Sequence, residues 1–103
     1  MKLAVPRDHL LAACKLANLA VAPSPTMPAF GSLQLYAHAG DTLEIIGADL
    51  DKGLKVTIHA TVEEEGGILL PARLLVDYLD QLPEGVRIDV QVQNLTLTAN
   101  LKA

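Results

Sequence analysis

Four side chains of this sequence could take part in acid–base, nucleophilic or metal chemistry: His9, Cys14, His38 and His59. The two later histidines fall on polar faces of different predicted strands, and no HxxxH or CxxC spacing joins any pair as metal ligands. Cys14 lies on an apolar helical stripe, which favours a small buried hydrophobic residue over a nucleophile. No glycine-rich phosphate loop, serine elbow or paired-carboxylate motif is present. The pattern therefore disfavours an enzyme, and we expect no metal or cofactor.

An acidic run, Glu63 to Glu65, stands before Gly66 and Gly67. Consecutive carboxylates bind a cation only where other ligands converge on it, and the sequence indicates none. We predict a solvated turn here.

The helices that would position these side chains follow one pattern, which occurs at 3–17 and again at 68–83 with an offset of 65 residues. Each copy is an apolar strand, then a proline (Pro6 or Pro71), then an apolar stripe at helical spacing. Proline suits the first helical turn because the amide it lacks has no partner there. Outward positions are Asp8, Lys15 and Asn18 in the first copy and Arg73, Asp77, Asp80 and Gln81 in the second. One face of each helix should pack, and the other is free to meet a partner.

Alternation of apolar and polar residues predicts strands at 33–39, 42–45, 54–62, 86–92 and 95–101. Three prolines within 22–28 predict a loop. The chain then consists of two strand–helix–strand–strand–strand repeats, the first over 1–65 and the second over 66–103. The second repeat is one strand short, so by its own symmetry the sequence is cut off before its last strand. We predict an α+β domain with two helices packed on antiparallel sheets.

Length and composition limit the class of protein. The 103 residues suit a single domain over 1–103, half of them apolar, and one cysteine allows no internal disulfide. A formal charge of −4 argues against a generally basic surface that coats nucleic acid. No leader or membrane-spanning run is evident, so we expect a cytoplasmic protein without a membrane partner.

The order of these elements resembles the first domain of a bacterial sliding clamp, the beta subunit of DNA polymerase III. Five segments carry the resemblance in the right order: 1–11, 25–28, 47–50, 70–73 and 82–85. In that family three such domains per subunit and two subunits enclose duplex DNA, with helices lining the hole. The resemblance implies a non-catalytic processivity factor that contacts phosphates weakly and non-specifically. It also implies DNA polymerase III, the clamp loader and a ring of clamp domains as partners, the peptide-binding pocket lying in other domains.

The same resemblance indicates DNA-contacting residues. Arg73 matches a family arginine that reaches DNA from the second helix, and Ser24 stands where an arginine is common. Leu74 and Asp80 also replace basic residues, and Lys15 is expected to offset these losses in part.

A second interpretation is an interaction module that does not encircle DNA. In the family, the strand that closes the ring would follow the last residue here, so the segment 95–103 would be an exposed sheet edge. Such an edge pairs with other strands.

Overall fold

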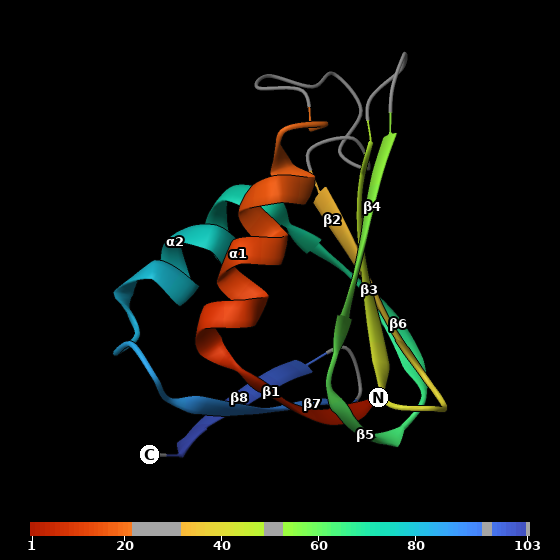
Figure 1. Cartoon of the computed structure of the whole chain (residues 1–103), viewed down its shortest axis with the longest axis vertical. Coiled ribbons are helices and arrows are strands. Elements are labelled where there is room, and N and C mark those ends of the chain that lie inside the picture. The colour runs from red at the N-terminus through yellow and green to blue at the C-terminus, as the bar shows by residue number, and fades with distance from the viewer. Residues whose placement is uncertain (22–31, 49–52, 94–95, 103) are drawn as a thin grey trace.

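The structure of the chain is a computed structural model that describes residues 1–21, 32–48, 53–93 and 96–102. Two helices lie side by side against two antiparallel sheets, the α+β class predicted above (Figure 1). In chain order the elements are β1 (Lys2–Pro6), α1 (Arg7–Asn18), β2 (Ser32–His38), β3 (Thr42–Ala48), β4 (Gly53–His59), β5 (Thr61–Glu64), β6 (Gly66–Pro71), α2 (Ala72–Gln81), β7 (Arg87–Gln93) and β8 (Thr96–Lys102). No helix among the described residues is long and apolar enough to cross a membrane.

The helices begin where the prolines predict. Pro6 and Pro71 each occupy the capping position, with extended backbone, directly before the first helical residue. The apolar stripe of α1 is buried, and that of α2 is buried at Leu75 and Leu79 and half-buried at Val76. Both stripes pack against the inward side chains of the strands, and together they form one aliphatic core.

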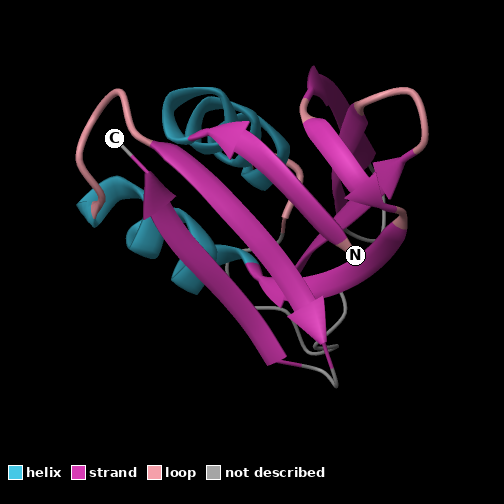
Figure 2. Cartoon of the chain, turned by 90° about the horizontal axis from the view of Figure 1, so that it is seen from below, coloured by secondary structure: helices cyan, strands magenta, loops and turns pink. Residues whose placement is uncertain are grey.

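The strands form two four-stranded antiparallel sheets. Sheet A has the order β5-β1-β7-β8, and sheet B has the order β4-β3-β2-β6. Figure 2 looks onto sheet A, with the strand that leads to the C-terminus at its margin. Each sheet contains strands from both halves of the chain, because β1 pairs with β7 and β6 pairs with β2. The boundary between the repeats at residues 65 and 66 stays a prediction.

The single long strand predicted over 54–62 is wrong. It is two strands, β4 in sheet B and β5 in sheet A, separated at Ala60. Asp41 holds this bend: its carbonyl accepts the Ala60 amide at 3.0 Å, and its carboxylate accepts the Val62 amide at 3.0 Å. The chain thus leaves one sheet for the other without losing backbone hydrogen bonds.

Two boundaries also differ from the predictions. The segment 63–67 is not a free turn, because Glu63 and Glu64 belong to β5, and Gly66 and Gly67 to β6. The three glutamates are nevertheless exposed, as expected. Strand β2 ends at His38, before Ala39, whose amide donates to Glu65 Oε1 at 2.8 Å. A side-chain acceptor here replaces the next ladder hydrogen bond.

Candidate nucleic-acid interface

Arg73 lies in the first turn of α2 and is exposed. It forms no hydrogen bond or ion pair with another described residue. A guanidinium in this state keeps its full charge and its forked donors for an outside acceptor such as a phosphate. Its placement agrees with the outward stripe derived from helical spacing.

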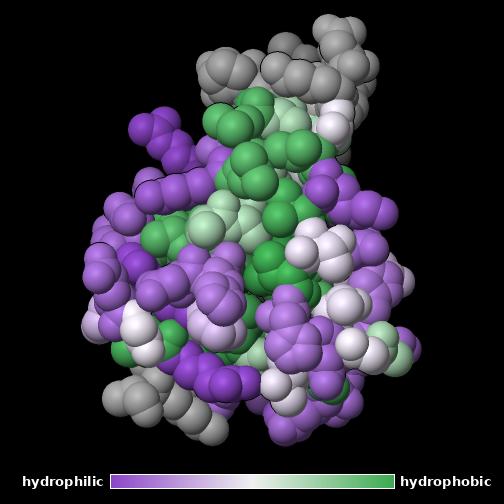
Figure 3. Space-filling view, in the orientation of Figure 1, coloured by the Kyte–Doolittle hydropathy of each residue, from purple (hydrophilic) through white to green (hydrophobic). Residues whose placement is uncertain are grey.

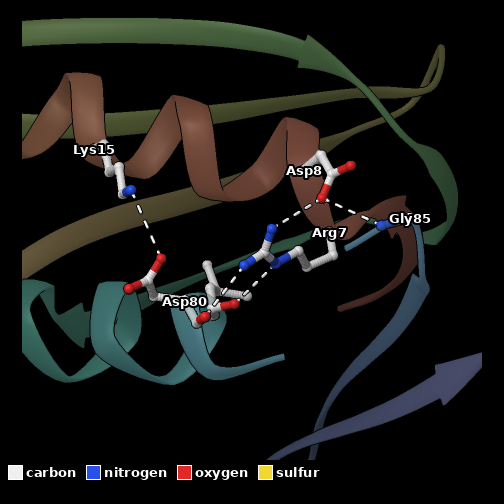
Figure 4. Close-up of polar contacts among 6 residues, drawn as sticks. Arg7, Asp8, Lys15, Asp80 and Gly85 are labelled. Carbon is white, nitrogen blue, oxygen red and sulfur yellow. Dashed lines mark hydrogen bonds and ion pairs between the residues drawn. The ribbon is translucent and has the colours of Figure 1, made fainter. Parts of the chain in front are cut away.

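Lys15 is also exposed, on α1, but it lies close to a carboxylate. Its Nζ is 3.7 Å from Oδ1 of Asp80 on α2 (Figure 4). Both side chains are more than half exposed, so the pair adds little to stability. It does offset the positive charge that Lys15 was expected to offer to DNA. Ser24, the third predicted contact, lies outside the described residues.

The outer surface of the two helices has no positive excess. Its fully charged exposed residues are the cations Lys15 and Arg73 and the carboxylates Asp8, Asp77 and Asp80. Several large apolar side chains are exposed beside them: Leu16, Leu19, Leu74 and Tyr78. In the view of Figure 3 an apolar band runs over α1, with hydrophilic side chains around it. This surface can touch a duplex but would attract it only weakly.

A buried arginine holds the two helices together, and the sequence analysis missed its role. Arg7 is 7% exposed, and its Nε donates to the carbonyl of Leu79 at 2.9 Å. A terminal nitrogen donates to the carbonyl of Asp80 at 3.2 Å (Figure 4). These carbonyls belong to the last turn of α2, where no intrahelical donor reaches them. The signal was available, since Arg7 stands three residues before Leu10 on the buried stripe.

Asp8 completes this joint from its exposed side. Arg7 donates to its Oδ1 at 3.0 Å, and the amide of Gly85 approaches the same oxygen at 3.4 Å. These two donors lower the pKa of Asp8 below its ordinary value of 3.8. The carboxylate therefore links the start of α1 to the turn that follows α2.

The candidate chemical residues are not arranged as a catalytic centre. Burial raises the pKa of Cys14 to about 12, so the thiolate that a nucleophile needs is absent at neutral pH. The three histidines lie on α1, β2 and β4, and the described part of the chain gathers no three metal-ligating side chains. The helix surface with Arg73 remains the best candidate site.

Comparison with known proteins identifies the family. The family model of the DNA polymerase III beta subunit, N-terminal domain, matches residues 1–102. The chain belongs to this family. The resemblance inferred from the five sequence segments is thereby confirmed.

Relatives with this domain are beta sliding clamps. The chain is 36% identical over 95 residues to the one from Salmonella typhimurium, which covers 90% of this chain and 25% of the relative. It is also 36% identical over 86 residues to the one from Synechocystis, which covers 82% and 22%. The chain thus spans about a quarter of the length of the relatives it matches.

Solved structures agree with the fold. The Caulobacter crescentus pol III beta structure superposes with a TM-score of 0.92 at 27% identity, covering 99% of this chain and 27% of that one. The DNA polymerase III subunit beta from Pseudomonas aeruginosa gives a TM-score of 0.91 at 29% identity, covering 98% and 27%. The chain therefore has the fold of one sliding-clamp domain.

Proposed function

We propose that this chain serves as the first domain of a sliding clamp, a non-catalytic processivity factor, and contributes one segment of a ring around duplex DNA. Its membership in the family over nearly its whole length is the observation that carries the proposal. The side-by-side helices would face the DNA, and Arg73 would contact a phosphate. DNA polymerase III and the clamp loader would bind through the complete clamp, in the cytoplasm.

The charges set how strong this contact can be. Exposed carboxylates outnumber the two exposed cations on the described helices, and Lys15 already faces Asp80. Each neutralised phosphate adds about 0.9 to the slope of log K against log salt. With Arg73 as the one described helix cation clear of a carboxylate, we expect a slope of about 1. Retention on DNA would then depend on ring closure.

The test compares two arginine variants. Arg73→Gln removes the proposed contact on α2, and Arg87→Gln removes an exposed arginine on sheet A that donates to Thr61 at 3.0 Å. Binding of a short labelled duplex is followed by fluorescence anisotropy over a series of low salt concentrations. We expect Arg73→Gln to weaken binding and to lower the salt slope by about 0.9, with Arg87→Gln unchanged. Equal effects of the two variants would refute the helix surface as the DNA-facing side.

A further inference from the structure

The two halves of the chain place their first strands in equivalent settings. In sheet A, Leu3 of β1 lies opposite Val90 of β7. In sheet B, Ile68 of β6 lies opposite Leu35 of β2, and Ile68 is 65 residues after Leu3. Both pairings are antiparallel, and each of the two strands leads through a proline into a helix. Strand β6 is therefore the structural counterpart of β1, and β8 of β3.

The counterparts differ in what covers their other edges. β3 pairs with β4, and β1 pairs with β5, so the continuous segment 53–64 covers both edges in passing from sheet B to sheet A. Among the described strands, β8 pairs only with β7, and β6 pairs only with β2. The second half thus has two open edges where the first half has one bent segment.

The burial of equivalent residues records this difference. Leu3 and Val5 of β1 are 3% and 0% exposed, whereas their counterparts Ile68 and Leu70 are only half-buried. Ala60, at the bend of the covering segment, is 1% exposed. The apolar side of β6 was built like that of β1, but in the described chain nothing closes it.

An apolar hollow lies at this uncovered place. It has a volume of about 230 Å³ and is lined by Leu70, Pro71, Leu74, Leu75 and Tyr78. A narrower apolar gap beside it reaches the core residues Leu10 and Ile88. Leu74 is 68% exposed and Tyr78 44% exposed, large values for side chains in contact with an apolar hollow.

We propose that the edges of β8 and β6 bind one extended peptide segment from another polypeptide, with the residue pattern of 53–64. The segment would run antiparallel to β8, bend at a small residue equivalent to Ala60, and continue antiparallel to β6. Its backbone would satisfy the open amides and carbonyls, and its apolar residues would cover the hollow. This inference extends the interaction-module interpretation and does not depend on contact with DNA.

The probe is a synthetic peptide copying residues 53–64, which already fits the equivalent place in the first half. Peptide binding is measured by fluorescence anisotropy, and amide hydrogen exchange of the chain is measured with and without the peptide. We expect saturable 1:1 binding, new protection of amides in β6 and β8, and no new protection in β4. A peptide with the same composition in scrambled order should not bind.

Two protein variants locate the site. Leu74→Lys places a charge beside the hollow, and Leu19→Lys is its match, because Leu19 is 72% exposed on the other helical segment and does not line the hollow. We expect Leu74→Lys to weaken peptide binding at least about tenfold and Leu19→Lys to leave it unchanged. Thermal unfolding of both variants checks that each remains folded.

Three outcomes would overturn the proposal. The peptide could fail to bind, or it could protect amides of β4 in place of β6 and β8. The free chain could already be a dimer whose β6 and β8 amides are protected, which light scattering with hydrogen exchange detects. In that case a second copy covers the edges, and no separate strand segment is needed.

Discussion

Replacing Arg7 by methionine should destabilise the fold strongly, because this side chain fastens α1 to the end of α2. Two hydrogen bonds from its buried guanidinium to helix-end carbonyls would be lost, at 2.9 and 3.2 Å. A hydrogen bond from a charged donor contributes about 1.5–3 kcal/mol, and losses that share a partner are not additive. Methionine restores most of the packing. We therefore expect about 2–4 kcal/mol, with a melting temperature lower by roughly 10–20 °C.

The assay is urea unfolding followed by circular dichroism, with the transition slope compared between variants. Arg73→Met is the matched control, since Arg73 is exposed near the start of the other helix, and its loss should change stability by less than about 0.5 kcal/mol. Arg7→Lys should fall between the two, because an ammonium keeps the charge but not the planar fork. If Arg7→Met and Arg73→Met proved equally stable, the joint between the helices would carry no weight and our reasoning would be wrong.

Two further predictions concern close packing and pH. A Cβ at Gly47 would collide with the backbone carbonyl of Ala17, so Gly47→Ala should cost about 1–3 kcal/mol, whereas Gly53→Ala, whose nearest listed neighbour would be 3.7 Å away, should fold normally; equal melting temperatures would contradict this. Because the pKa of Asp8 is lowered on folding, its stabilising effect exists above the unfolded value of 3.8 and is lost as pH falls through the folded value. The stability difference between the wild type and Asp8→Asn should therefore shrink below that pH in urea titrations, and a constant difference would exclude this linkage.

The helices could be predicted from the sequence because their burial repeats at helical spacing and a proline marks each start. The split between β4 and β5 could not, because apolar residues alternate without interruption from Leu54 through Ala60 to Val62. The bend depends on Asp41, which is far away in the sequence and accepts two amides there. The exposed position of Arg73 followed from spacing alone, whereas the approach of Lys15 to Asp80 depends on how the helices lie against each other.

The two halves use equivalent positions for different purposes. Arg7 and Asp8 correspond to Ala72 and Arg73, 65 residues later. In the first half the arginine is buried and its neighbouring carboxylate joins it, so both residues hold the structure together. In the second half a 2% exposed alanine fills the buried position, and the arginine moves to the outward one, where no described carboxylate pairs with it. A change at Arg7 should therefore alter stability, and a change at Arg73 should alter only the contact with DNA.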